Sequence, residues 1–294
     1  MRLLTALHRW WGLAFCLLFA MWFASGIVMH FVPFPARTET GRTGGVAVID
    51  SGEVRSEQNA LHIAAAYARE GRLDASHASA KLIDYDQWTV AGEFDSDRPL
   101  YRVALGDDVG TELYLSSATG NVVLLTTKKM RLANYLGSIA HWVYPTVLRH
   151  KRQLWSALMW WLSLLATIGA SIGVMIGVVR LRTGSAYQGL QRWHHRFGLI
   201  IAPFILCWIF SGFLSMGDGE LFGFATKPVS LFRALHTFDF PPLASIPWLR
   251  TSLIVGLCLC GLAFSLTGVT LAWRRLRISF ARPKEIPENL NTRT

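Results

Sequence analysis

Four apolar stretches constrain this chain more than any other feature. Each runs for about 20 residues, long enough for a helix to cross the roughly 30 Å hydrocarbon core of a bilayer. They extend from Gly12 to Val32, Leu154 to Val179, Phe197 to Met216 and Leu253 to Trp273. The 294 residues are 52% hydrophobic and only 16% charged, so a bilayer is the expected solvent. The sequence therefore predicts a polytopic α-helical membrane protein, with a four-helix transmembrane bundle.

Basic residues at the ends of these spans predict an orientation. Lys and Arg gather on the cytoplasmic side of short loops. Arginines cluster in the loop after the second span and in the tail after the fourth: Arg180, Arg182, Arg192, Arg196, Arg274, Arg275 and Arg277. We therefore expect both termini in the cytoplasm and the first span to be an uncleaved anchor. Arg149, Lys151 and Arg152, before the second span, argue for the opposite orientation.

The net charge of +10 follows from the basic clusters, which would contact anionic lipid head groups. Lipid bilayer is therefore an expected partner, and nucleic acid is not.

A stretch with the composition of a water-soluble domain separates the first two spans. Glu57 to Glu70 has helical spacing, and β-rich runs follow at Lys81 to Ala91, Pro99 to Leu105, Glu112 to Leu115 and Val122 to Leu125. These patterns predict a helix and a small antiparallel sheet in the periplasm. No catalytic set of side chains stands out there, so this domain is expected to bind or position a partner.

These features divide the chain into six segments. Residues 1–32 hold the N-terminal segment and first span, 33–130 the α+β domain, and 131–182 a periplasmic interfacial segment and the second span. Residues 183–216 hold a cytoplasmic loop and the third span, 217–252 a periplasmic loop, and 253–294 the fourth span and cytoplasmic tail.

Internal repeats relate the spans in pairs. His8-x-x-Trp11-Gly12-Leu13, followed by Trp22-x-x-Ser25-Gly26, recurs at one constant spacing as His194-x-x-Phe197-Gly198-Leu199, followed by Trp208-x-x-Ser211-Gly212. Likewise, Gly173-Val174 and Arg180-Leu181-Arg182 recur as Gly268-Val269 and Arg275-Leu276-Arg277, which aligns His141 with His236. The bundle is therefore predicted to consist of two parallel helix-pair repeats.

The repeats group four histidines into two pairs. His8 and His194 are expected at the cytoplasmic ends of the first and third spans, and His141 and His236 precede the second and fourth spans on the outer side. Imidazole is a good axial ligand for haem iron, and helix bundles build cofactor sites from facing helices. The pattern predicts two haem b groups, with iron bound through these four residues. The alternative is interfacial histidines that bind head groups or cap helices.

Two further histidines stay open as ligands. His195 neighbours His194 and points about 100° away around the helix. His30 lies about 40° from the face of His8, so it could serve the outer haem. Its repeat counterpart is Met216.

With these residues in view, the chain resembles the PepSY-associated transmembrane family over almost its whole length. The resemblance rests on His8-Arg9-Trp10-Trp11-Gly12-Leu13, Gly137-x-x-x-His141-Trp142-x-Tyr144-Pro145, Trp193-His194-His195-x-x-Gly198-Leu199 and Leu235-His236-Thr237-Phe238-Asp239-Phe240. It implies a bacterial inner-membrane protein, with a PepSY-like periplasmic domain inserted between helices 1 and 2. Some members are haem-containing reductases of ferric siderophores, and His8, His141, His194 and His236 are the positions to carry over as ligands.

The leading hypothesis is therefore a di-haem membrane oxidoreductase that passes electrons to a periplasmic ferric siderophore or another iron chelate. No Gly-x-Gly-x-x-Gly fingerprint for a nicotinamide or flavin occurs, so a quinol or a separate reductase is the expected electron donor. Two alternatives are a membrane-anchored PepSY binding or regulatory protein, and a haem electron-transfer subunit for a periplasmic partner enzyme. Paired histidines favour the haem hypotheses, because an anchor has no need of them.

Overall fold

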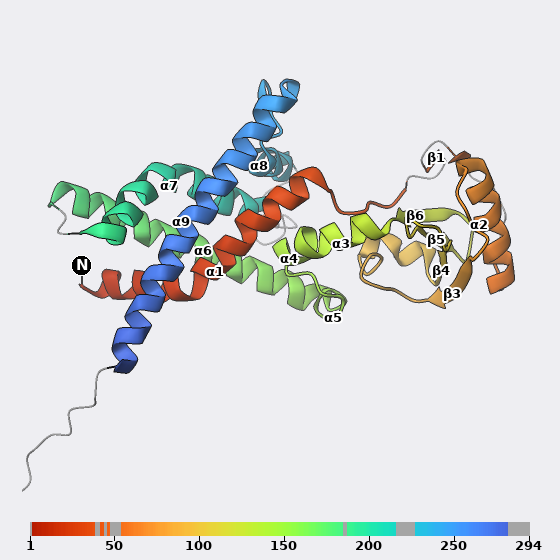
Figure 1. Ribbon diagram of the computed structural model, residues 1–294, viewed down its shortest axis with the longest axis horizontal. Helices are drawn as coiled ribbons and strands as arrows, with labels where there is room; N and C mark the ends of the chain where they lie inside the picture. The colour runs from red at the N-terminus through yellow and green to blue at the C-terminus, as the bar shows by residue number, and fades with distance from the viewer. Residues whose placement is uncertain are drawn as a thin grey trace, which may run out of the picture. The chain divides into compact units, whose positions relative to one another are not determined.

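The computed structural model describes residues 2–38, 42–43, 46–47, 54–184, 187–215 and 227–281 (Figure 1). The chain divides into two compact units. The helical unit comprises Met1–Phe23 and Ser163–Thr294, and the sheet unit comprises Ala24–Leu162. Met216, the first part of the predicted loop 217–252 and the end of the predicted tail lie outside the described residues.

Four long apolar helices are present in the described part of the chain. They are α1 (Arg2–Phe31), α6 (Arg152–Arg182), α7 (Gly189–Ser215) and α9 (Pro247–Ala281). The prediction of four helices long and apolar enough to cross a membrane is confirmed. Each helix begins before its predicted apolar stretch, because the polar and basic residues that precede the stretch are also compatible with a helix. For this reason α1 already includes His8.

Glycine allows close helix contacts within the helical unit. A Cβ on Gly261 of α9 would lie 2.6 Å from ring carbons of Phe23 on α1. The Phe23 ring in turn lies 5.9 Å from the Trp208 ring of α7, measured between ring centroids. Helix α7 also packs along α8 (Lys227–Thr237), and a short 3-10 helix, η2 (Leu243–Ser245), precedes α9. Such close approach at small residues is typical of packing between membrane helices.

The sheet unit contains a four-stranded antiparallel sheet with α2 (Glu57–Gly71) on one face (Figure 1). Its strands follow chain order: β3 (Ser79–Ile83), β4 (Leu100–Ala104), β5 (Glu112–Ser116) and β6 (Val122–Thr126). Ile63 of α2 belongs to one buried cluster with Val103 and Leu113 of the sheet. The predicted helix and small antiparallel sheet are therefore confirmed. A separate two-stranded pair is formed by β1 (Arg42–Thr43) and β2 (Val46–Ala47).

One predicted strand was too long. We expected a strand from Lys81 to Ala91, but β3 ends at Ile83. The carboxylate of Asp86 accepts hydrogen bonds from the backbone N–H groups of Trp88 at 2.9 Å and Thr89 at 3.2 Å. This local bonding turns the chain toward the 3-10 helix η1 (Gly92–Asp97) and overrides the β propensity of the residues that follow Asp86.

The second face of the sheet carries an aromatic core around Tyr114. This side chain is fully buried, and its hydroxyl lies 2.7 Å from Asp86 Oδ2 and 3.1 Å from Glu112 Oε2. Burial raises the pKa of Tyr114 above its ordinary value, and the two carboxylates raise it further. The hydroxyl therefore stays protonated and donates to the carboxylates.

Three short helices connect the sheet to α6: α3 (Lys128–Leu136), α4 (Ser138–His141) and α5 (Thr146–Arg149). The buried Asn134 amide donates to the carbonyl of Pro33 at 3.2 Å, and a Cβ on Gly137 would lie 3.1 Å from Val28. The end of α3 therefore packs against the last turns of α1. Leu136, the last residue of α3, is 71% exposed.

Asp95 carries an ion-pair network on the surface of the sheet unit. Its carboxylate accepts hydrogen bonds from the guanidinium groups of Arg98 and Arg152. The bond from Arg152 and the positive charges of both arginines lower the pKa of Asp95.

Candidate functional site

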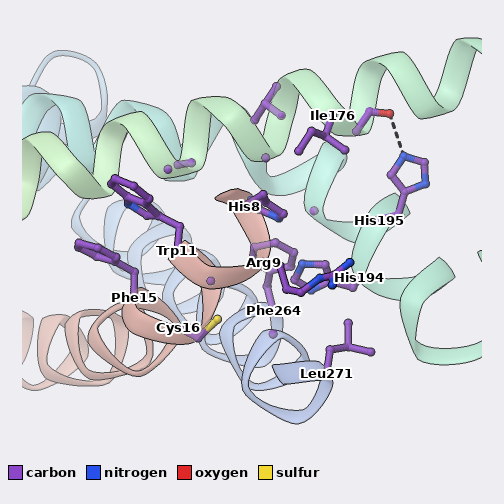
Figure 2. A pocket seen from close by; sticks show the side chains of 18 of the residues that line it. His8, Arg9, Trp11, Phe15, Cys16, Ile176, His194, His195, Phe264 and Leu271 are labelled. Atoms are coloured by element: carbon purple, nitrogen blue, oxygen red, sulfur yellow. Dashed lines mark hydrogen bonds between the residues drawn. The ribbon is translucent and has the colours of Figure 1, made fainter. Parts of the chain in front are cut away.

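A cavity in the helical unit collects side chains from α1, α6, α7 and α9. Its volume is about 260 Å³, somewhat below the roughly 300–1,000 Å³ typical of small-molecule sites. His8 of α1 and His194 of α7 both line it, and Figure 2 shows the two rings side by side in the same cavity. The exposed Arg9 and Arg275 also line it and mark its polar end.

Glycines of α6 hold His8 in place. A Cβ on Gly173 would lie 2.6 Å from Cε1 of His8, so the imidazole rests directly on the backbone of α6. One turn further along α1, the Trp11 Nε1–H donates to the carbonyl of Leu165 at 2.8 Å. These contacts place the N-terminal part of α1 against α6.

His194 is oriented by a hydroxyl and an aromatic ring of α9. Its Nδ1 lies 2.7 Å from Thr267 Oγ1, and the Thr267 hydroxyl lies 2.6 Å from the carbonyl of Phe264. Since that hydroxyl donates to the carbonyl, its oxygen accepts a hydrogen bond from Nδ1–H. The lone pair of the neutral ring is then on Nε2. The ring also stacks on Phe264, with centroids 4.5 Å apart and planes 13° from parallel.

His195 has a different arrangement. Its Nε2 lies 2.8 Å from the carbonyl of Gly177, so the Nε2–H must donate and carries no lone pair. Figure 2 shows the ring turned toward α6 and away from His194. Neighbouring helical residues separate in this way because they point about 100° apart. The sequence left His194 and His195 open as alternatives, and the two rings have different hydrogen-bond partners in the structure.

The outer histidines each lie beside a buried serine. In the sheet unit, His141 of α4 has its Nδ1 3.0 Å from Oγ of Ser25. In the helical unit, His236 of α8 donates from Nδ1 to the carbonyl of Trp208 at 2.9 Å, with Oγ of Ser211 at 3.4 Å. Burial lowers the pKa of His236, which favours the neutral imidazole. His141 and His236 lie in different units.

His30 lies in the last turn of α1, in the sheet unit, with its ring centroid 5.1 Å from that of Phe31. Its predicted counterpart, Met216, lies outside the described residues. His30 stays one of the two weaker candidates from the sequence.

Several residues that build these sites were missed from the sequence. Ser25 and Ser211 were noticed only as repeat markers, and Thr267 was not noticed at all. The sequence does contain a pattern that predicts the glycine contacts. Gly169, Gly173 and Gly177 recur every four residues and so lie on one face of α6. Thr267 gave no signal, since single threonines in apolar helices commonly bond to their own backbone.

The residues of the cavity fit a haem group. Imidazole nitrogens can serve as axial ligands of haem iron. Apolar walls and bare glycine backbone suit a flat macrocycle. Arginine can pair with the carboxylates of the haem. No cluster of three His, Cys, Asp or Glu side chains occurs in the described ranges. Such a cluster binds a bare metal ion, whereas porphyrin brings four nitrogen ligands of its own.

The chain matches no family model, and no curated protein or solved structure is significantly similar to it. Its class therefore follows from its own geometry. It is a helical protein with four helices able to cross a membrane, a small α+β unit, and a histidine-lined cavity among the long helices.

Proposed function

We propose that this protein is a haem-containing membrane oxidoreductase, which carries electrons across a bacterial inner membrane to a ferric chelate in the periplasm. The observation that carries the proposal is the convergence of His8 and His194, far apart in the chain, in one cavity among the long helices. Ionisable side chains are rare inside membranes and mark functional sites there.

The cavity residues would hold a haem b in complementary ways. His8 and His194 would hold the iron, and the Thr267 bond to Nδ1 would keep His194 in the tautomer with its lone pair on Nε2. Arg9 and Arg275 also line the cavity and would pair with the carboxylates of the haem itself. When bound, haem supplies one-electron chemistry, with a potential tuned by its ligands and its burial.

A second haem b, with His141 and His236 as ligands, stays a prediction from the repeat. Each imidazole has its Nδ1 near a serine oxygen, as second-shell bonding of metal ligands requires. Trp208 offers further support, because its buried Nε1–H has no hydrogen-bond partner among the described residues. An orphan donor beside His236 suits a site that receives a polar group from outside the protein.

The physiological role rests on the resemblance to the PepSY-associated family. By that resemblance, the sheet unit is a PepSY-like periplasmic domain, both termini are cytoplasmic, and the two helix pairs are parallel repeats. The acceptor is a ferric siderophore or a similar iron chelate, and the donor is a quinol or a reductase.

The test is a dithionite-reduced-minus-oxidised visible spectrum of the detergent-purified protein, with the haem quantified as pyridine haemochrome. We expect two b haems per chain. His8→Ala and His194→Ala should each lose one, whereas His195→Ala should keep both, because its Nε2 bonds to Gly177.

The same measurement separates the rival functions. A colourless protein from haem-replete cells would refute the proposal and leave a PepSY-like binding protein with a membrane anchor. Two haems without reduction of ferric chelates by the pre-reduced protein would indicate an electron-transfer subunit for a partner enzyme. Loss of haem in His195→Ala, with retention in His194→Ala, would reverse the ligand assignment.

A further inference from the structure

Helix α3 buries a polar side and exposes an apolar one, the reverse of a helix on the surface of a water-soluble protein. Asn134 is fully buried, and its amide donates to the carbonyl of Pro33 at 3.2 Å. Leu132, Tyr135 and Leu136 are instead 59%, 52% and 71% exposed. Single exposed apolar residues are common on protein surfaces, but these three share one face of a nine-residue helix.

Hydrogen bonds to the sheet fix the direction of this apolar face. The Arg131 guanidinium donates to Oγ1 of Thr126 at 2.9 Å and to the carbonyl of Gly110 at 3.0 Å. It also lies 3.4 Å from the carboxylate of Glu112. Rotation of α3 that buried its leucines would break these bonds and leave a partly buried charge without its partners, which is costly. The exposed apolar face is therefore built into the sheet unit.

The end of α3 lies beside the last turns of α1, which is long and apolar enough to cross a membrane. Gly137 directly follows Leu136, and a Cβ on it would lie 3.1 Å from Cγ1 of Val28 and 3.4 Å from Cγ of Met29. These residues and α3 all belong to the sheet unit. The apolar face of α3 therefore lies at the level where α1 would leave a bilayer.

Two lysines occupy the other end of α3. Lys128 and Lys129 are exposed, and neither forms an ion pair with an acid in the described ranges. Lys128 lies about 12 Å from Leu136 along the helix axis, at 1.5 Å per residue. The head-group region of a bilayer is about 5–8 Å thick on each side of the hydrocarbon core. An oblique α3 can thus reach from the lipid phosphates to the acyl chains.

We propose that α3 is a membrane-docking helix, which seats the sheet unit on a bilayer that contains anionic lipids. Its face of Leu132, Tyr135 and Leu136 enters the lipid, and Lys128 and Lys129 pair with the head-group phosphates. An apolar face beside basic residues is typical of helices that lie in this interface, and tyrosine is enriched at the same depth. The inference does not depend on haem or on electron transfer.

Charge favours lipid over the two protein surfaces that could cover the same face. Among the described residues of the helical unit the one acid is Asp239, which already lies 3.8 Å from Arg250. That unit therefore offers the lysines no free acidic partner. A second copy packed α3 to α3 would bring four lysines together, and like charges repel. Anionic head groups attract them instead.

The experiment places the photo-crosslinking residue p-benzoylphenylalanine at the position of Leu132 or Leu136 in the full-length protein. The protein is irradiated in nanodiscs of equal parts phosphatidylglycerol and phosphatidylcholine. Mass spectrometry then distinguishes lipid adducts, crosslinks within the chain and crosslinked dimers. Both positions should give lipid adducts. The position of Val109, 55% exposed in the same unit but not on α3, is the control and should give none.

The lysines are tested by the same readout. Lys128→Gln combined with Lys129→Gln should lower the ratio of phosphatidylglycerol to phosphatidylcholine adducts at position 132, by up to about fivefold for each lysine. Lys81→Gln removes an exposed lysine of β3 and should leave the ratio unchanged. An equal ratio in the double variant and in Lys81→Gln would overturn the pairing with phosphates.

Crosslinks only to the long helices or to a second copy, at both leucine positions, would overturn the docking on lipid. Lipid adducts no more abundant than at position 109 would overturn it as well. Haem content enters neither readout, so failure of the proposed function and failure of this inference are distinguishable.

Discussion

The contact between His8 and Gly173 makes a methyl group at position 173 costly. A Cβ there would lie 2.6 Å from Cε1 and 3.0 Å from Nδ1 of His8, inside van der Waals contact. The ring would have to turn away, which strains a packed site. Overpacking costs about 1–3 kcal/mol, whereas replacing a helical glycine with alanine gains about 0.5–1 kcal/mol. Gly173→Ala should therefore lower the free energy of unfolding by up to about 2.5 kcal/mol.

Gly256 of α9 provides the matched control, because a Cβ there would meet no atom within 4 Å. Gly256→Ala should leave the free energy of unfolding unchanged or raise it by up to about 1 kcal/mol. Both variants would be unfolded reversibly in mixed micelles with increasing SDS, and tryptophan fluorescence would follow the transition. Equal free energies of unfolding for the two alanine variants would refute the packing of His8 on Gly173.

Three further predictions concern the sheet unit. Tyr114→Phe removes a hydroxyl donor from two partly buried carboxylates and should lower the free energy of unfolding by about 1–3 kcal/mol in urea. Tyr135→Phe, at 52% exposure, should change it by less than about 0.5 kcal/mol. The pKa of Asp95 is lower in the folded state, so its ion pairs stabilise the fold above the unfolded pKa and lose this effect as the pH falls through the folded value. Asp95→Asn should therefore flatten the acid side of the stability profile, and an unchanged profile would contradict this. A spin label at Leu136 in nanodiscs should be more accessible to oxygen, which concentrates in lipid, than to a polar nickel reagent, as measured by EPR power saturation. A spin label at the exposed Val109 should show the reverse.

Much of the fold could be predicted from the sequence, because each signal was local and strong. Apolar stretches of about 20 residues predict long membrane helices, since in a bilayer the helix satisfies its own backbone groups. The helix Glu57–Gly71 and the last three strands of the sheet also followed from periodicity. The strand after Lys81 was predicted too long because Asp86, a single polar residue, bonds to the backbone beyond it. The short helices α3, α4 and α5 were not predicted, since none is long enough to show a clear period.

Less of the candidate site could be predicted, and the reason is physical. The repeat identified His8 and His194 as a pair, and the structure places both at one cavity. It could not decide between His194 and His195, because that choice depends on the bonds to Thr267 and Gly177 from other helices. Hydrogen-bond partners across helices leave no periodic trace in a sequence.

The two repeat copies also differ where their histidines lie, and this limits what symmetry alone can predict. His194 stacks on Phe264, but the residue equivalent to Phe264 in the other helix pair is Gly169. Trp11 occupies the space over Gly169, where a Cβ would lie 2.2 Å from its ring. His194 is thus held by an aromatic face and a hydroxyl, and His8 by bare backbone. The surroundings of the two histidines therefore differ, which the matching sequence motifs do not reveal. In the proposed haem site they would contribute unequally, because ligand orientation and surroundings tune a haem.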